Sequence, residues 1–356
     1  MNNKELIQKL NKDGILKREE FVSLLNTFTE KDLKFAQSLA VKTAKKHFGN
    51  KIYIRGLIEF TNICKNDCLY CGLRCSNKNA ERYRLTPEEI LACCETGYPL
   101  GFRTFVLQGG EDPFFDDDAL CNIVREIKNR FSDCAVTLSV GERTKESYQR
   151  LFNAGADRYL LRHETASVGH YNLLHPENMS LKSRKECLFN LKEIGFQTGC
   201  GFMVGSPYQT TENIAEDLLF IKELSPQMVG IGPFIPHKDT PFFDKPAGDL
   251  NLTLFLLSLV RIMLKNVLLP STTALGTIIE NGREQGILSG ANVVMPNLSP
   301  DFAKKNYMLY DNKISAGPEA ASGLSDLKVR IEKIGYQIAV SRGDFKYLKE
   351  NLYGKI

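Results

Sequence analysis

Short apolar runs alternate with amphipathic stretches from about residue 52 onward, whereas the first 50 residues hold amphipathic stretches alone. In that first part, acidic residues precede segments in which apolar residues recur every three or four positions, which predicts helices. The later runs are rich in β-branched residues and predict strands. The eight predicted strands are 52–61, 104–108, 135–139, 158–163, 197–204, 228–234, 267–273 and 291–295.

The stretches between these strands carry helix start and stop signals. The string from Thr86 to Glu89 combines a capping box with proline at the first helical position, and the helix predicted at 188–194 ends at Gly195. Strands that alternate with helices predict parallel βα units. We therefore predict an α/β fold with a (β/α)8 TIM-type barrel at 51–300. An N-terminal helical segment at 1–50 precedes it, and a C-terminal extension at 301–356, with a loop at 317–323, packs on it.

An open, doubly wound sheet is the alternative arrangement of the same units. That fold favours a Gly-x-Gly-x-x-Gly turn directly after a strand. Gly199 and Gly201 lie within a predicted strand and do not supply such a turn, so the barrel is preferred.

Composition narrows the class of protein. Apolar residue types make up 43% of the chain and charged types 25%, which is typical of globular proteins. No run approaches the roughly 20 apolar residues of a membrane span. The first residues lack the charged-then-apolar pattern of an export signal, so we expect no export. A net charge of +4 on 356 residues is too small to indicate a nucleic-acid partner. We expect a cytoplasmic protein without a membrane or nucleic-acid partner.

Cysteine is the unusual residue type. Of the ten cysteines, four lie within residues 64–75, and Cys64, Cys68 and Cys71 follow the first predicted strand directly. In a barrel, that places the thiols at the face where active sites lie. Three thiolates at this spacing can hold one 4Fe-4S cluster and leave its fourth iron open. A zinc site with Cys75 as the fourth ligand is the alternative.

The string from Asn62 to Leu73, with Tyr70 directly before the last cysteine, resembles the signature of the radical S-adenosylmethionine (SAM) superfamily. The resemblance implies that SAM chelates the open iron and that cluster reduction yields a 5′-deoxyadenosyl radical, so the cofactors carry the chemistry. The strings at 108–113, 205–207 and 228–233 resemble further elements of the superfamily.

Within the superfamily, the chain resembles the biotin-synthase-like branch, and most of all the HydE family of FeFe-hydrogenase maturases. The strings that carry this resemblance are 158–166, 229–237, 272–277 and 290–297. The resemblance implies a small organometallic iron substrate carrying cysteine, carbon monoxide and cyanide. It also implies delivery by the maturase HydG, transfer to the maturase HydF, and an electron donor such as a ferredoxin or flavodoxin.

The same resemblance implies roles for individual residues. Cys64, Cys68 and Cys71 bind the cluster, Glu164 bonds the ribose hydroxyls of SAM, and Arg184 bonds its carboxylate. The full set of implied SAM-binding residues is Tyr70, Gln108, Gly109, Gly110, Glu111, Ser139, Glu164, Arg184 and Met228. The substrate cavity is implied to be lined by Arg162, Thr137, Thr272 and Thr273, of which Arg162 and Thr137 are the catalytic candidates. Without the resemblance, residues 162–164 indicate an ion-pair cluster at a strand end, Arg184 indicates a solvated helix charge, and the role of His163 is open.

Some related enzymes carry cysteine or arginine at positions where this chain has neither, and these differences distinguish the chain from them. Many members of the family hold a second cluster with cysteines near residues 310–325, but the segment 310–322 has none here, so we predict a single cluster. Biotin synthases carry a cysteine on strand two and an arginine on strand eight, and neither is present at 104–108 or 291–295. Methylornithine synthesis and a non-enzymatic role as an iron–sulfur carrier are two further candidate functions.

Overall fold

The computed structural model describes residues 1–314 and 323–346. The predicted loop at 317–323 is therefore described only at Gly323. The cysteine-free segment at 310–322 is described only as far as residue 314.

Six parallel strands form the main sheet, in the order β2-β3-β4-β5-β6-β8. Each strand pairs with the next one along the chain, and the intervening helices lie on the outside, as expected for right-handed βα units. The strands are β2 (Gly56–Thr61), β3 (Thr104–Gly109), β4 (Ala135–Ser139), β5 (Arg158–Leu160), β6 (Gln197–Cys200) and β8 (Met228–Val229).

Isolated parallel bridges continue this sheet into a closed ring. Residues 267–270 join β8 on one side and β10 (Val293–Val294) on the other, and the segment after β10 returns to β2. The bridging pairs are Met228–Leu268, Pro270–Val293 and Leu57–Asn297. Backbone hydrogen bonds follow the same path, with Leu268 accepting from the Val229 N–H at 3.1 Å. The predicted eight-stranded barrel is thereby confirmed.

Several strands are shorter than their hydrophobic runs. The run at 52–61 divides into β1 (Lys51–Ile54) and β2, and the runs at 197–204 and 228–234 divide to give β7 (Met203–Val204) and β9 (Gly232–Pro233), which pair with each other. A side chain at Gly201 would place its Cβ 1.9 Å from the carbonyl oxygen of Gly230, so the two backbones touch where these strands divide. The strand predicted at 267–273 is too long, because Thr273 begins helix α11.

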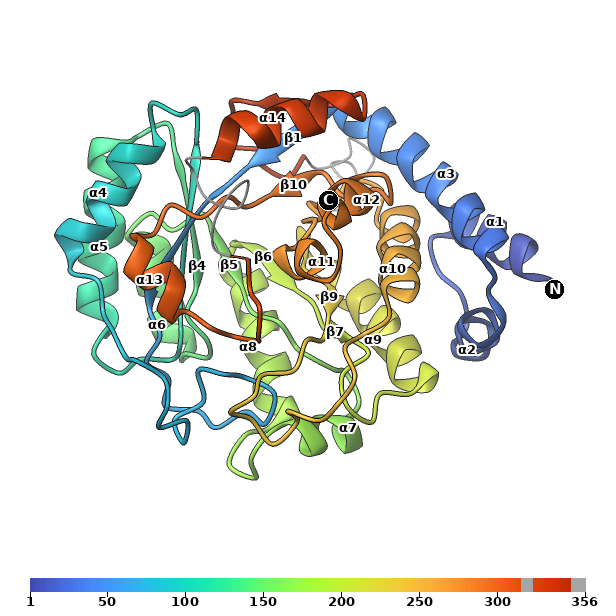
Figure 1. The fold of residues 1–356 in the computed structure, drawn as a ribbon, viewed down its shortest axis with the longest axis horizontal. Coiled ribbons are helices and arrows are strands. Elements are labelled where there is room, and N and C mark those ends of the chain that lie inside the picture. Colours follow the sequence, from blue (N-terminus) through green and yellow to red (C-terminus); the bar gives the residue numbers. More distant parts are fainter. Residues whose placement is uncertain (315–322, 347–356) are drawn as a thin grey trace, which may run out of the picture.

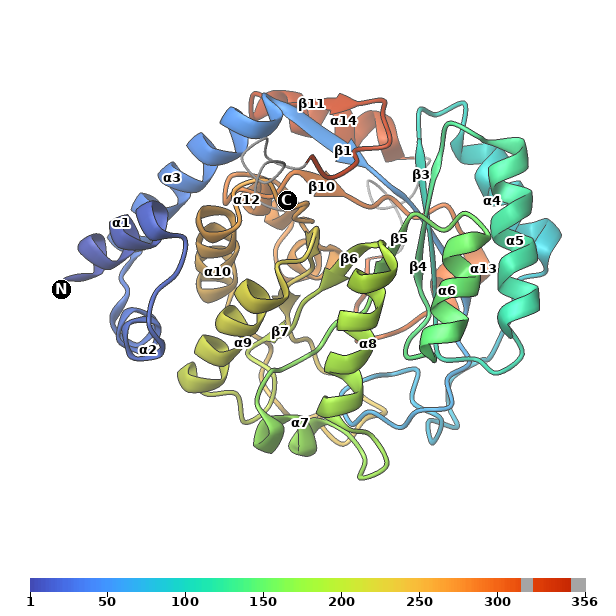
Figure 2. The ribbon, with the colours of Figure 1, turned by 180° about the vertical axis from the view of Figure 1, so that it is seen from behind.

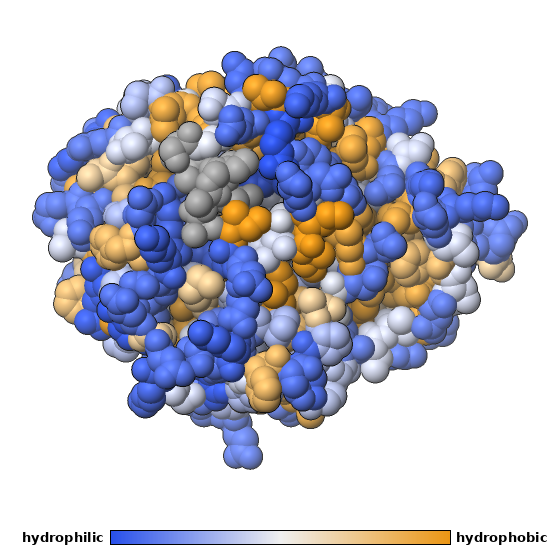
Figure 3. Space-filling view, viewed as in Figure 1, coloured by the Kyte–Doolittle hydropathy of each residue, from blue (hydrophilic) through white to orange (hydrophobic). Residues whose placement is uncertain are grey.

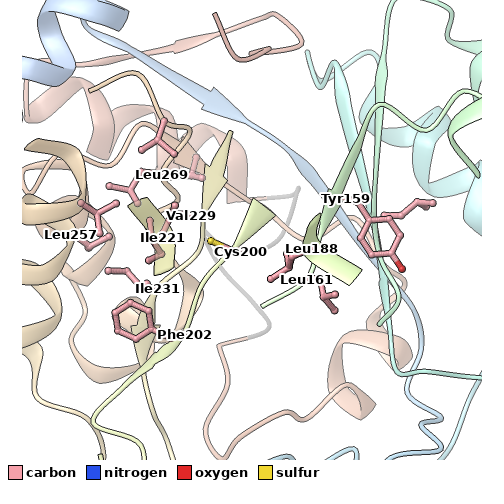
Figure 4. Packing of buried hydrophobic residues seen from close by; sticks show 14 of the residues in the cluster. Tyr159, Leu161, Leu188, Cys200, Phe202, Ile221, Val229, Ile231, Leu257 and Leu269 are labelled. Atoms are coloured by element: carbon pink, nitrogen blue, oxygen red, sulfur yellow. The ribbon is translucent and has the colours of Figure 1, made fainter. Parts of the chain in front are cut away.

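Helices surround the barrel (Figures 1 and 2). The hydrophobic core is formed by buried side chains of these helices and of the strands. In Figure 4, Ile221 of α9 and Leu257 of α10 lie beside Val229 of β8, and all three are fully buried. The surrounding helices are α4 (Pro87–Gly97), α5 (Asp117–Arg130), α6 (Lys145–Asn153), α7 (Val168–Leu174), α8 (Leu181–Ile194), α9 (Thr211–Leu224), α10 (Leu250–Met263), α11 (Thr273–Ile278) and α12 (Gly282–Ile287). The capping box predicted at Thr86 is present at the start of α4.

Both ends of the chain pack against the barrel. The N-terminal helices α1 (Asn3–Asp13), α2 (Arg18–Thr27) and α3 (Glu30–Phe48) lie along α9 and α10. After β10, the chain forms α13 (Asp301–Asn306) and α14 (Leu324–Lys333), and then β11 (Gln337–Ala339) pairs with β1. The residues after β11 reach the amino-terminal ends of the barrel strands, which we call the base of the barrel; the opposite end is its mouth.

The surface seen in Figure 1 is largely hydrophilic, with apolar side chains gathered near its centre (Figure 3). Within the described ranges, no helix is both long enough and apolar enough to cross a lipid bilayer.

Candidate active site

The three cysteines of the predicted cluster motif lie in the long loop between β2 and α4, at the mouth of the barrel. Burial raises the pKa of Cys71 to about 12, and the neighbouring Cys64 thiol adds to this effect. Burial raises the pKa of Cys68 as well, with a further contribution from Cys71. The Cys71 N–H donates to the Cys68 carbonyl at 3.3 Å, so a tight turn keeps these two residues together within the loop.

In the described part of the chain, no three Cys, His, Asp or Glu side chains converge on a single point at metal-ligand distances. A cubane cluster does not require such convergence, because each thiolate binds a different iron. Cys75 is exposed on the solvent side of the same loop.

One side of the cysteine loop rests on helix α7 and the residue that follows it. The Tyr70 hydroxyl lies 3.2 Å from His175 Nε2, and the two rings meet edge to face. Burial lowers the pKa of His175 to about 3, so the ring is neutral. Its Nδ1 donates to the Tyr171 carbonyl at 2.9 Å, which leaves Nε2 to accept from Tyr70. His175 therefore fixes the residue directly before Cys71, a role that no sequence signal indicated.

The other side of the loop touches the Gly-Gly-Glu segment at the end of β3. A side chain at Gly110 would place its Cβ 2.2 Å from the Ile63 carbonyl oxygen and 2.7 Å from Cys64 Cβ. The Glu111 N–H points at Cys64 Sγ, 3.4 Å away. Glycine is thus required here for the approach of the cysteine loop itself.

Glu111 also ties this segment to the next loop. Its carboxylate accepts from the Glu142 N–H at 3.0 Å and lies 3.3 Å from Lys65 Nζ.

Two surface cavities flank the cysteine loop on either side. One of about 360 Å³ includes Lys65, Glu111 and Glu142 in its lining, and one of about 590 Å³ includes Gly72 and His237.

The end of the strand-five segment presents a partly buried arginine and a buried carboxylate that are poorly paired. Arg162 Nη2 lies 3.1 Å from Glu164 Oε2. The pair is nevertheless misaligned, because Arg162 Nε, Arg162 Nη2 and Glu164 Oε2 have no hydrogen-bond partner among the described residues. Burial raises the pKa of Glu164, against the opposing charges of Arg162 and Arg184. Unsatisfied buried polar atoms are costly, and they mark a place where a ligand would supply the missing bonds.

Arg184 on α8 faces the same group of residues. Its Nε donates to Glu142 at 2.6 Å and its Nη1 donates to the Arg162 carbonyl at 3.1 Å. Burial alone would lower the pKa of Arg184, but the surrounding Tyr171, Glu142 and Tyr70 raise it overall. The residue is buried rather than solvated, and it stands between the cysteine loop and the end of strand β5.

Residues of β3 and β4 and the residue before α11 add polar groups to the barrel wall. Gln108 at the end of β3 donates to the Tyr307 hydroxyl at 3.3 Å and pairs in register with Ser139 of β4. Thr137 Oγ1 and Thr272 Oγ1 are buried without a hydrogen-bond partner in the described ranges. Tyr307 comes from the segment after α13, and only its position in the fold identifies it as a site residue.

Two predicted site residues are placed differently from the rest. The thioether of Met228 accepts from Arg55 Nη1 at 3.0 Å, and Met228 packs with Leu268 and Phe345. Its implied contact with SAM stays a prediction. Thr273 is the first residue of helix α11 rather than a strand residue.

These groups match what a site for a 4Fe-4S cluster and SAM requires. Three neighbouring thiols provide the donors that iron–sulfur clusters use. An unpartnered carboxylate oxygen at Glu164 can accept from hydroxyl groups, and a guanidinium such as that of Arg184 pairs with a carboxylate. Gly109 and Gly110 leave the backbone accessible beside the thiols.

Comparison with known proteins agrees with this chemistry. Residues 58–221 match the Radical SAM superfamily model. The chain is 44% identical to the [FeFe] hydrogenase maturase subunit HydE of Thermotoga maritima, across 94% of this chain and 95% of the relative.

Two solved structures share the fold. Methylornithine synthase (PylB) superposes with a TM-score of 0.81 at 25% identity, covering 94% of this chain and 97% of that one. HydG, a maturase of the [FeFe]-hydrogenase, superposes with a TM-score of 0.82 at 20% identity, covering 96% of this chain and 77% of that one. The chain is therefore a radical SAM enzyme that uses a 4Fe-4S cluster and SAM, and it belongs to the HydE family.

Proposed function

We propose that the chain acts in FeFe-hydrogenase maturation, on a small organometallic iron species during assembly of the di-iron centre. The observation that carries the proposal is the similarity to the Thermotoga maritima maturase, which spans 94% of this chain rather than the cysteine motif alone. The proposal includes HydG as the supplier of the iron species, HydF as its acceptor, a ferredoxin or flavodoxin as electron donor, and the cytoplasm as location.

In this proposal Cys64, Cys68 and Cys71 hold the cluster. When bound, the reduced cluster and SAM supply a 5′-deoxyadenosyl radical. Tyr70, held by His175, keeps the Cys71 end of the loop in place. The backbone of residues 109–111 packs against the Cys64 end, so both ends of the motif are fixed before the cofactors bind.

The SAM contacts come from the ends of strands β3, β4 and β5 and from helix α8. Glu164 accepts hydrogen bonds from the ribose hydroxyls, and Arg184 supplies a positive charge to the SAM carboxylate. Gln108 and Ser139 line the same side of the mouth.

The substrate occupies the upper barrel beside these contacts, with Arg162, Thr137, Thr272 and Thr273 around it. Arg162 suits an anionic iron carbonyl–cyanide species, because a guanidinium makes charge-assisted hydrogen bonds. The unpartnered hydroxyls of Thr137 and Thr272 add donors and acceptors on the facing wall. Met228 of β8, which packs with Leu268, contributes its thioether to the SAM contacts.

Activation of apo-FeFe-hydrogenase tests the proposal. Apo-hydrogenase is incubated with HydG, HydF, SAM and a reductant, with and without this protein. Hydrogen evolution is expected only when the reconstituted protein is present. Equal activation without it would overturn the assignment to this pathway.

Arg162→Lys tests the substrate assignment separately. Lysine keeps the charge but loses the planar fork, so activation should be clearly impaired while SAM affinity stays normal. Loss of SAM binding, or activation at the wild-type level, would remove Arg162 from the substrate site.

A further inference from the structure

The turn that presents Glu164 to the mouth adopts a backbone conformation that side chains rarely take. Glu164 has φ +63°, in the left-handed region. For a residue other than glycine this conformation costs on the order of 1–3 kcal/mol, and it persists only where the surroundings enforce it. Other groups of this chain must therefore hold Glu164 in place.

A buried histidine and a buried aspartate contact the turn at residues 162–166 on the side away from the mouth. His163 and Asp217 are both fully buried, and His163 Nε2 lies 3.3 Å from Asp217 Oδ1, as a close contact rather than an aligned hydrogen bond. Asp217, on α9, accepts from the Ala166 N–H, two residues beyond Glu164. Burial lowers the pKa of His163 far below its usual value, so the ring is neutral.

The same histidine ties the turn to the neighbouring strand. The Gly201 N–H donates to His163 Nδ1 at 3.3 Å, and the Glu164 N–H donates to the Gly201 carbonyl at 3.1 Å. Gly201 cannot shift easily, because it packs directly against the Gly230 backbone. His163 and Glu164 are thus fixed to one rigid point between strands β5 and β6.

Helix α8 holds the outer ends of the turn. Arg184 donates to the Arg162 carbonyl at 3.1 Å, and Lys185 donates to the Ala166 carbonyl at 3.1 Å. Residues 162–166 therefore have bonds on both flanks and behind, while the Glu164 carboxylate faces forward without a complete set of partners among the described residues.

We propose that His163 and Asp217 are positioning residues that hold Glu164 in its left-handed conformation and so aim its carboxylate at SAM. This inference rests on the proposed role of Glu164. A purely packing role for the histidine is the competing explanation, since its ring also lies 4.9 Å from that of Phe220. A buried polar pair is weak evidence for stability, which leaves geometry as the better reason for its presence.

A double-mutant cycle on SAM binding separates the two explanations. SAM affinity is measured on reconstituted protein for wild type, His163→Leu, Glu164→Ala and the double variant. His163→Leu is expected to weaken SAM binding on the order of tenfold, because a small misplacement of a contact group is costly. The double variant is expected to bind SAM no more weakly than Glu164→Ala. Once the carboxylate has been removed, the loss of the residue that orients it has no further effect on SAM affinity.

Three further variants guard against a general folding defect. Asp217→Asn keeps an acceptor for the Ala166 N–H, and His163→Asn keeps an acceptor for the Gly201 N–H, so both are expected to bind SAM better than His163→Leu. Asn292→Leu is the matched control, because Asn292 is equally buried and accepts from Arg261 and Leu269 away from the mouth. It is expected to lower the melting temperature without changing SAM affinity.

Each outcome bears on one claim only. Additive losses in the cycle, or unchanged affinity in His163→Leu, would overturn the positioning role while leaving Glu164 as a SAM contact. Unchanged affinity in Glu164→Ala would instead overturn the proposed contact itself. A crystal structure of His163→Leu without cofactors gives a readout independent of activity: φ of residue 164 is expected to leave the left-handed region, and retention of +63° would contradict the inference.

Discussion

The base and the mouth of the barrel both carry arginine and carboxylate side chains, but they differ in which groups supply the partners. At the base, fully buried Arg158 donates to Asp344 at 2.6 Å, to the Arg342 carbonyl at 2.8 Å and to Thr104 at 2.9 Å. At the mouth, Glu164 is buried and Arg162 is partly buried, yet neither completes its hydrogen bonds within the described residues.

The difference follows from what covers each end. The segment after β11 inserts under the base and brings its own acceptors, including a bond from Gln197 to Asp344 at 2.9 Å. The mouth is covered by loops that leave polar atoms facing inward. Pairing at the base is not complete, since Arg55 Nε and Nη2 have no partner in the described ranges. The contrast teaches that burial alone does not mark a binding site, whereas burial without partners at the strand carboxyl ends does.

The largest expected effect lies at the mouth. Changing Cys68 to Ala should abolish formation of 5′-deoxyadenosine, because a cubane held by three thiolates loses one ligand. Anaerobic reconstitution followed by chromatography of the products measures it. Cys75→Ala is the control and should retain activity, and loss of activity there would bring Cys75 into the ligand set.

Arg158→Met should produce the largest loss of stability without directly touching the SAM site. Removing one partner of a buried ion pair leaves the other uncompensated and typically costs about 3–5 kcal/mol. Because Asp344 is partly exposed, we expect the lower end of that range in urea unfolding. The double variant Arg158→Met/Asp344→Leu should recover much of the loss, and if it were less stable than the single variant, the base would not depend on this pairing.

Glu164→Ala should weaken SAM binding with little loss of stability, which is the opposite of the effect expected for Arg158→Met. SAM binding should weaken by roughly ten- to hundredfold, equivalent to about 1.5–3 kcal/mol for hydrogen bonds to a charged group. Stability should fall little or rise, since the change removes strain and an unsatisfied carboxylate. Isothermal titration with SAM and thermal unfolding test both halves, and an unchanged dissociation constant would return Glu164 to a structural role.

The smallest expected effect is the contribution of Asp344, at the base of the barrel, to the stability of the fold at acidic pH. Burial opposes ionisation of Asp344, but hydrogen bonding from Arg342 and the charge of Arg158 lower its pKa to about 2. A carboxylate with a lowered pKa stabilises the fold above its unfolded pKa near 3.9 and loses that contribution as pH falls toward 2. The stability difference between wild type and Asp344→Asn should therefore shrink over this range. A difference independent of pH would show that the charge of Asp344 contributes nothing.

The sequence alone determined the elements whose signals are local. Alternating apolar runs located the strands, because periodicity depends only on neighbouring residues. The spacing of Cys64, Cys68 and Cys71 directly after a strand indicated an iron–sulfur cluster or a zinc site, and the resemblance to a known family implied the cluster and the roles of residues 162 and 164. These inferences needed no knowledge of which distant segments meet.

The tertiary structure decided the contacts between residues far apart in the chain. His175 beneath Tyr70, Tyr307 beside Gln108 and Asp344 beneath Arg158 join segments separated by more than 100 positions. Sequence periodicity says which side of a strand a residue occupies, but not its height in the barrel, so it does not place Met228 relative to the mouth. Height depends on the register between strands, which bridges such as Met228–Leu268 establish only when the ring closes. The strained backbone at Glu164 likewise exists only because helices α8 and α9 and the backbone at Gly201 enforce it together.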